Sequence, residues 1–185
     1  MARRLTLRDG AVVEVRALRP GDRAALAAAI DRLSPRSRYL RFATPKPGVS
    51  ERELDVLLDL DHHDREALLA IDPATRRGVG VARFARFPGE DDVVDVAVTV
   101  ADEWQGRGLG RALLELLVAR ARAEGHTALH ADVLSANAPS IALLRGAGFR
   151  PVPGGGGGVL SQYERRLGGE VVGSAQTAAR ACSAE

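Results

Sequence analysis

Alternating hydrophobic and polar positions open the chain and predict a β-hairpin. The stretches LTLRDG and AVVEVRAL meet at Asp9-Gly10, and an Asp-Gly pair between alternating stretches is a strong hairpin signal. EALLAID, GVGVARFARF and DVVDVAVTV predict three more strands, the first two joined by the turn PATRRG. TALHADVL, the region opened by Phe149 and VLSQYERRL complete the predicted strands.

Apolar residues at helical spacing predict the helices between these strands. Residues 22–33 place Leu26, Ile30 and Leu33 on one face behind Asp22, the expected N-cap. SPRSRYLRF follows as a short helical segment, and the Ser-x-x-Glu spacing at the start of SERELDVLLDL predicts a capping box. A longer helix follows the glycines after residue 105, and NAPSIALLRGAGF, with proline in its first turn, predicts the last one.

The length and composition limit the domain organisation. A chain of 185 residues with 45% hydrophobic residues can bury one core of ordinary size, so we expect one domain over residues 1–167. Residues 168–185 are small and polar without an apolar period, which predicts a disordered tail. Five consecutive glycines in PVPGGGGGVL cost too much backbone entropy for a regular element, so we expect a flexible hairpin loop there.

Charge and cysteine content argue against several function classes. The 26 Lys and Arg residues against 24 Asp and Glu leave a formal net charge of +2, too small for a broad field that attracts nucleic acid or an anionic membrane. The only cysteine, Cys182, offers neither an intramolecular disulfide nor a cysteine metal cluster. No segment approaches the roughly 20 apolar residues that span a bilayer, and we expect a soluble cytoplasmic protein.

Three glycines between the strand DVVDVAVTV and the following helix predict an anion-binding turn. Gly106, Gly108 and Gly110 allow the backbone to approach an anion that a Cβ would hold away, and the first N–H groups of a helix lack helical partners. A diphosphate suits such a turn. The dinucleotide pattern G-x-G-x-x-G fails because Arg111 stands at its third glycine, and the P-loop pattern fails because the only lysine, Lys46, lies elsewhere.

The residues QGRGLG, from Gln105 to Gly110, match the pattern [QR]-x-x-G-x-[GA], and here the sequence resembles the GNAT superfamily of N-acetyltransferases, whose acetyl-CoA loop has this form. NAPSIALLRGAGF is similar to the second signature of that family, with five positions in register: Asn137, Ser140, Leu143, Gly148 and Phe149. The resemblance implies an α/β (α+β) fold: a mixed, mostly antiparallel sheet of about seven strands with helices on both faces.

The resemblance also implies roles for individual residues. The backbones of Val98 and Val100 would pair with the pantetheine arm of acetyl-CoA as an added strand does. Asn137 would reach the pantetheine, and Ser140 the CoA side of the cleft. The loop and the helix start that would hold the diphosphate comprise Gln105, Gly106, Arg107, Gly108, Leu109, Gly110 and Arg111.

Transfer of an acetyl group to an amine requires a base or a desolvating pocket, because a lysine with a pKa near 10.4 is neutral in only about one molecule in 2,500 at pH 7. Related enzymes often place a glutamate on the strand before the loop, and the matching position is Asp95. Aspartate is one methylene shorter, which leaves its reach open. Glu103 is the weaker candidate, because we expect it to point out of the loop.

Three other features complete the predicted site. Many family members supply a tyrosine as the acid for the leaving thiolate, where this chain has Leu144, but a thiol with a pKa near 8.5 can leave without one. His62 and His63 point to different sides and lack a third ligand at useful spacing, so we expect no metal. We expect Trp104 to fill the base of the loop and His130 to be a strand residue.

The acceptor is the least determined part of the function. LSPRSRYLRF and SERELDVLLDLDHHDREALLAI resemble segments of the bacterial protein lysine acetyltransferases of the Pat branch, which implies a lysine on another protein, such as an acyl-CoA synthetase, as the acceptor. A small amine is the alternative, because acceptor loops vary freely within one fold. A catalytically inert module that binds acetyl-CoA and reports it to a partner is a third hypothesis, motivated by Asp95 and Leu144. No aromatic and basic stripe supports nucleic-acid binding.

Overall fold

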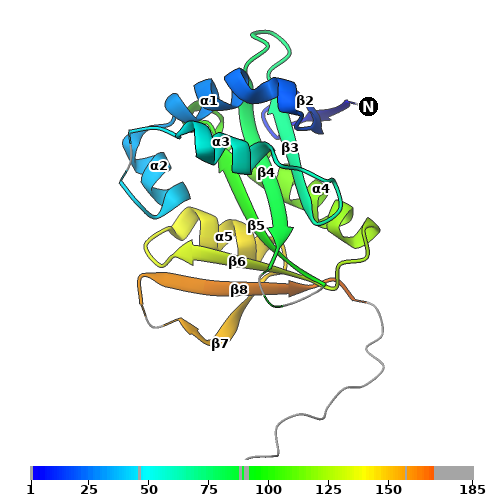
Figure 1. Ribbon diagram of the computed structural model, residues 1–185, viewed down its shortest axis with the longest axis vertical. Coiled ribbons are helices and arrows are strands. Elements are labelled where there is room, and N and C mark those ends of the chain that lie inside the picture. The colour runs from blue at the N-terminus through cyan, green and yellow to red at the C-terminus, as the bar shows by residue number, and fades with distance from the viewer. Residues whose placement is uncertain (1, 46, 88, 90–91, 157, 169–185) are drawn as a thin grey trace, which may run out of the picture.

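One sheet of eight strands organises the molecule (Figure 1). The computed structural model describes residues 2–45, 47–87, 89, 92–156 and 158–168. The strands are β1 (Arg3–Thr6), β2 (Val12–Ala17), β3 (Arg65–Ile71), β4 (Gly78–Arg86), β5 (Val93–Val100), β6 (Ala128–Leu134), β7 (Arg150–Gly156) and β8 (Leu160–Arg166). The helices are α1 (Arg23–Asp31), α2 (Pro35–Phe42), α3 (Glu51–Leu58), α4 (Leu109–Ala123) and α5 (Ala138–Gly146), with short 3-10 turns η1 (Pro20–Asp22) and η2 (Asp102–Trp104).

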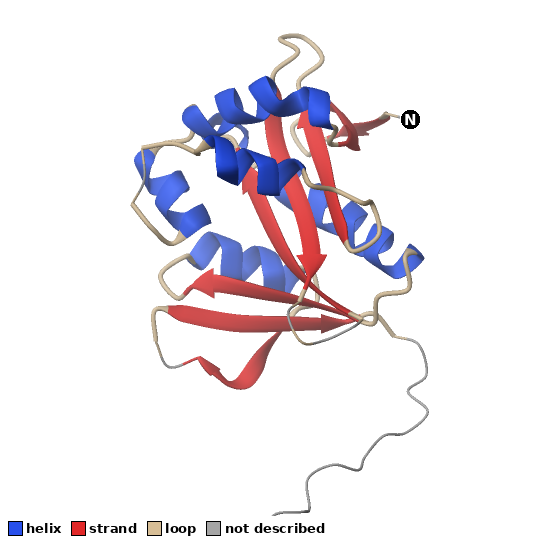
Figure 2. Cartoon of the chain, in the orientation of Figure 1, coloured by secondary structure: helices blue, strands red, loops and turns tan. Residues whose placement is uncertain are grey.

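The strand order is β1-β2-β3-β4-β5-β6-β8-β7. Neighbouring strands are antiparallel except β5 and β6, which run parallel and pair only from Val93 opposite Ala128 to Asp95 opposite His130. Beyond this short pairing the two strands diverge, as Figure 2 shows. The mixed, mostly antiparallel sheet confirms the expected fold class, with eight strands against the expected number of about seven.

Helices cover both faces of the sheet and form two cores. On one face, α4 and α5 pack on the central strands, and Leu109, Leu113, Leu114 and Leu117 of α4 are completely buried. Truncating one such leucine to alanine typically costs about 2–5 kcal/mol. On the other face, α1 and α3 cover β3 through Leu26, Ile30, Leu54 and Leu58. The apolar faces that the sequence predicted for these helices therefore face the two cores.

The local signals for turns and caps are confirmed. Gly10 has a φ of +83°, in the left-handed region that the predicted hairpin turn requires. Ser50 and Glu53 form the capping box of α3, with reciprocal bonds of 2.8 and 3.3 Å between side chains and backbone N–H groups. Asp22 does stand at the N-cap of α1, but its carboxylate accepts from Arg16 and from the Arg19 N–H rather than from α1.

The glycine-rich segment before β8 differs from the expected loop. Strand β7 continues to Gly156, which pairs with Ser161 across an irregular register. Ladder hydrogen bonds come from the backbone, so glycines can complete a strand when a neighbouring strand supplies the partners. A disordered tail was predicted for residues 168–185. Residues 169–185 lie outside the described part of the chain.

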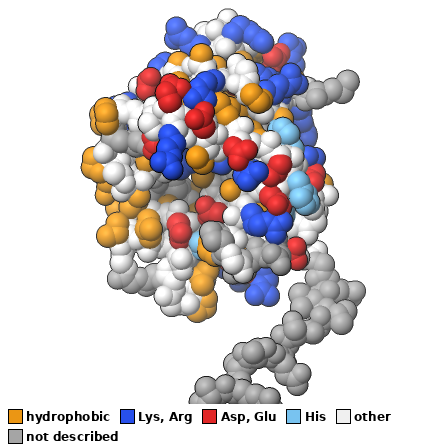
Figure 3. All heavy atoms as spheres, in the orientation of Figure 1, with side chains coloured by type: hydrophobic (Ala, Val, Ile, Leu, Met, Phe, Trp, Pro, Cys, Tyr) orange, Lys and Arg blue, Asp and Glu red, His pale blue; other side chains and the backbone are white. Residues whose placement is uncertain are grey.

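Charged side chains of both signs are interspersed on the face that α1 and α3 cover (Figure 3). Arg23 of α1, for example, bonds to Glu51 and Asp55 of α3 at 2.6 and 2.7 Å. This face therefore presents a mixed surface rather than a field of one sign. Within the described residues, every helix is too short or too polar to cross a bilayer.

Candidate active site

The edge of β5 that faces away from β4 is open over its second half. Ala101 donates to the carbonyl of Val79 at 2.9 Å, and bonded pairs alternate along an antiparallel ladder, so the N–H and C=O groups of Val98 and Val100 point away from β4. Strand β6 pairs with β5 no further than Asp95. In the described part of the chain, this backbone therefore has no strand partner on that side.

Helix α4 begins beside this open edge with backbone N–H groups that the helix does not use. Gly108 is its N-cap with a φ of +92°, and Gly106 before it has a φ of +73°. Such values favour glycine. Ala112 donates to the carbonyl of Gly108 at 3.1 Å, so the N–H groups of residues 109–111 precede the helical ladder. No side chain caps them, and they form the turn suited to an anion.

Arginine side chains around this turn are held by neighbouring groups. Arg107 forms an ion pair with Asp9 of the first hairpin, and its guanidinium lies 4.3 Å from the ring centre of Trp104. Arg111 bonds to Glu115 at 2.8 Å and to the carbonyl of Gly146 at 2.7 Å. Arg8 also lies at the turn, its Nε 3.5 Å from a Cβ placed on Gly108, and its side chain has no hydrogen bond to the described residues. The free donors at the turn are therefore its backbone amides and this guanidinium.

Helix α5 packs beside the glycine turn. A Cβ placed on Gly110 would lie 3.5 Å from Leu143 of α5 and 3.6 Å from Val100 of β5. Asn137 is buried and caps α5, its Oδ1 accepting from the Ser140 N–H at 3.2 Å. The structure thus brings Gly110 of the turn next to Val98 and Val100 of β5 and next to Leu143 of α5, whereas Asn137 bonds within its own helix.

Asp95 stands at the last pairing position of β5 and β6, next to His130. Its Oδ1 lies 3.4 Å from Nδ1 of His130, with the Asp95 side chain 46% exposed and that of His130 9% exposed. The hydrogen bond that His130 donates to Asp95 is the main cause that raises the pKa of His130 above its ordinary value, while burial opposes the shift. Asp132 and Glu164 add to the negative potential at His130.

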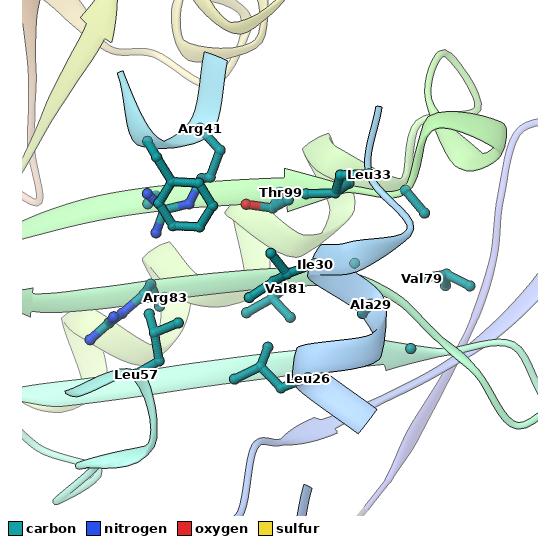
Figure 4. A pocket seen from close by; sticks show the side chains of 15 residues that line it. Leu26, Ala29, Ile30, Leu33, Arg41, Leu57, Val79, Val81, Arg83 and Thr99 are labelled. Atoms are coloured by element: carbon teal, nitrogen blue, oxygen red, sulfur yellow. The ribbon is translucent and has the colours of Figure 1, made fainter. Parts of the chain in front are cut away.

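A pocket lies on the same face of the sheet as Asp95. Arg83 stands opposite Ala97, and Asp95 and Ala97 share a face because they are two residues apart. The pocket, of about 50 Å³, is lined by residues of α1, α2, β4 and β5 together with Leu57 of α3. Figure 4 shows Arg41 of α2 and Arg83 at one end and apolar side chains at the other.

Comparison with known proteins identifies the family. Residues 35–149 match the model of the acetyltransferase (GNAT) family. The chain belongs to the GNAT acetyltransferase family. A GNAT relative, an acetyltransferase of Pseudomonas aeruginosa, is 34% identical over 146 residues, 78% of each chain.

One solved structure and one further sequence are also similar to this GNAT protein. The crystal structure of the GNAT domain of S. lividans PAT superposes with a TM-score of 0.82 and 28% identity, covering 89% of this chain and 96% of that one. The L-methionine sulfoximine/L-methionine sulfone acetyltransferase of Pseudomonas aeruginosa is 44% identical over 63 residues, 34% of this chain and 37% of its own length. The resemblance to Pat-type GNAT domains is therefore confirmed.

The residues of this GNAT protein that were not predicted to act in catalysis contact other parts of the fold. His62 bonds to buried Glu66 at 2.9 Å and His63 to Glu124 at 3.0 Å. No group of three His, Cys, Asp or Glu side chains converges as a metal site within the described residues. Trp104 packs against the main core. Leu144, which stands at the tyrosine position, is buried in the main core.

The sequence analysis missed three residues of the GNAT cleft. His130 was expected only as a strand residue, and its contact with Asp95 depends on the parallel register of β5 and β6, which no local pattern encodes. Arg83 had a visible signal, an arginine within the otherwise apolar strand GVGVARFARF. Arg41 had none, because its place follows from how α2 docks on the sheet.

Proposed function

We propose that the chain is an N-acetyltransferase that moves the acetyl group of acetyl-CoA directly to a primary amine. The observation that carries this proposal is the open backbone edge at Val98 and Val100 beside the uncapped start of α4. These groups fit acetyl-CoA: the edge offers hydrogen bonds to a pantetheine amide chain, and the glycine turn offers N–H groups to a diphosphate. Acetyl-CoA supplies the acetyl group as a thioester.

Asp95 would act as the base of the reaction. A bond forms between the amine nitrogen and the acetyl carbon, the carbon–sulfur bond breaks, and the sulfur leaves as a thiolate. Asp95 takes the proton from the amine, directly or through water. His130 is a positioning residue, since its bond to Asp95 orients the carboxylate. A thiol is acidic enough to leave without the tyrosine that Leu144 replaces.

Two acceptors are candidates. A lysine of another protein, such as an acyl-CoA synthetase, is supported by the similarity to the GNAT domain of S. lividans PAT. A small amine is supported by the small pocket of about 50 Å³ and by the relative named for methionine sulfoximine and methionine sulfone. The cytoplasmic location expected from the sequence stays a prediction.

Labelled acetyl transfer tests the proposal. The protein is incubated with radiolabelled acetyl-CoA and a heat-treated bacterial extract, and the label is counted in protein bands and in small molecules. Label in protein bands supports the lysine acceptor, and label only in small molecules supports the second candidate. Label in neither fraction, with acetyl-CoA binding retained in calorimetry, contradicts the proposal and favours the inert acetyl-CoA sensor.

A further inference from the structure

Two arginines of the pocket lack the partners that other arginines of this protein have. Arg16 forms a bidentate bond to Asp22, with both distances 2.7 Å. Arg41 and Arg83 make neither a hydrogen bond nor an ion pair with any described residue, and the Arg41 guanidinium lies over the ring of Phe42, 5.0 Å from its centre. Both guanidinium groups line the same pocket, from α2 and from β4 (Figure 4).

The surroundings make these two charges costly. Burial, and then the neighbouring charge of Arg83, lower the pKa of Arg41 to about 10. Burial also lowers the pKa of Arg83. Both side chains are partly buried, and a desolvated charge without a partner is unfavourable unless a counter-ion satisfies it. Among the described residues, Asp95 is the carboxylate whose charge acts on both arginines, and it is the base of the proposed reaction.

We propose that the acceptor is a small primary amine that carries a carboxylate or a similar anion, which Arg41 and Arg83 bind. This inference rests on the proposed function. The anion would occupy the arginine end of the pocket, and the amine would lie toward Asp95, so each charge of the acceptor meets its opposite. An α-amino acid has both groups on one carbon and suits this arrangement.

The rest of the pocket sets the size and polarity of the acceptor. The cavity of about 50 Å³ is well below the roughly 300–1,000 Å³ of drug-sized ligand sites, so a compact, uncharged side chain is expected. Two unpaired guanidiniums would repel a lysine ammonium that brings no anion with it. The apolar lining includes Leu26, Ile30, Leu33, Leu57, Val79 and Val81.

Matched acceptors test the inference by changing only the anion. Acetyl-CoA turnover is measured with L-amino acids that have uncharged side chains, methionine sulfone among them. Each amino acid is compared with its α-carboxamide, and a lysine peptide is measured as well. We expect kcat/KM for the best amino acid to exceed that of its carboxamide by about tenfold to a hundredfold, the range of charge-assisted hydrogen bonds. Equal turnover of the pair, or preference for the lysine peptide, overturns the inference and leaves the proposed function standing. Turnover of no amine at all overturns both.

Variants test which residues bind the anion. Arg83→Gln and Arg41→Gln should each reduce the preference for the amino acid over its carboxamide at least about fivefold. Both variants remove a poorly compensated charge, so their melting temperatures should not fall. Arg86→Gln, on the same strand but bonded to Asp64 outside the pocket, is the matched control and should keep the preference. An unchanged preference in the two pocket variants contradicts the assignment.

Discussion

Asp95 lies where the short pairing of β5 and β6 ends. The proposed chemistry depends on this residue because it is the base. Asp95→Asn removes the base but keeps the size of the side chain, so kcat should fall by about 10²–10⁴-fold, the usual contribution of general base catalysis. The Kd of acetyl-CoA should stay within a factor of about two, because cofactor binding rests on backbone groups of β5 and α4. Steady-state kinetics and calorimetry measure the two quantities.

Glu103→Gln is the matched control for that substitution. Glu103 is exposed in η2, so its loss should leave kcat unchanged. If Glu103→Gln lowered kcat more than Asp95→Asn did, the assignment of the base would be wrong.

His130 gives the folded protein a pH-dependent stability. Its pKa is raised in the folded state, first by the hydrogen bond to Asp95. The stabilisation is therefore complete below the unfolded pKa of about 6.5 and is lost as the pH rises through the raised value. Since Asp95 is about half exposed, we expect about 1 kcal/mol or less.

Urea unfolding of wild type and Asp95→Asn at about pH 6 and about pH 9 measures this effect. The difference in unfolding free energy between the two proteins should be larger at the lower pH. His63 also has a raised pKa, but it is present in both proteins and cancels in the difference. The same difference at both pH values would refute the coupling.

Among the elements, α2 is the helix that connects the glycine turn to the pocket. Asp102 accepts hydrogen bonds from the N–H and hydroxyl of Ser34 and from the hydroxyl of Ser37, at 2.6–2.9 Å. Gln105 donates both to Ser37 at 3.3 Å and to the carbonyl of Val100 at 3.1 Å. The N-terminus of the helix that carries Arg41 is thus fixed to the residues just before the glycine turn.

Asp102→Ala should loosen α2 from this anchor. We expect a loss of about 1–2 kcal/mol in unfolding free energy, because donors at a helix start lose their acceptor. The KM for the acceptor should rise several-fold while the Kd of acetyl-CoA changes little, since the glycine turn itself is intact. Thermal unfolding and acceptor titrations measure both, with the exposed neighbour substituted as Glu103→Ala for comparison. An unchanged acceptor KM would show that α2 does not position the pocket.

At the scale of the whole molecule, local patterns predicted the elements better than their arrangement. The hairpin at Gly10 and the capping box at Ser50 need only neighbouring residues, and both were predicted. The divergence of β5 and β6 depends on how far a parallel register extends, and β7 depends on the partner that β8 supplies to its glycines. The pocket depends on α2 and β4, which are distant in sequence, so Arg41 and Arg83 could not be paired by any spacing rule.

Because β5 and β6 diverge, alternate backbone amides of β5 lack a partner among the described strands. Bound acetyl-CoA should protect these amides from hydrogen exchange. The N–H groups of Ala97 and Thr99 face β4 and are already bonded in the ladder, whereas those of Val98 and Val100 face the open edge. When the pantetheine arm lies along this edge, hydrogen exchange at Val98, Val100 or both should slow at least about tenfold, with little change at Ala97 and Thr99.

Residue-resolved exchange by NMR measures this alternation, and adenosine 3′,5′-bisphosphate provides the control because it lacks the pantetheine arm. That nucleotide should leave Val98 and Val100 unprotected. Equal slowing at all four residues would instead indicate general stabilisation by a bound ligand, which acts on the whole fold. Alternating protection would place the arm along β5 and, with it, the thioester near Asp95 at the point where β6 departs.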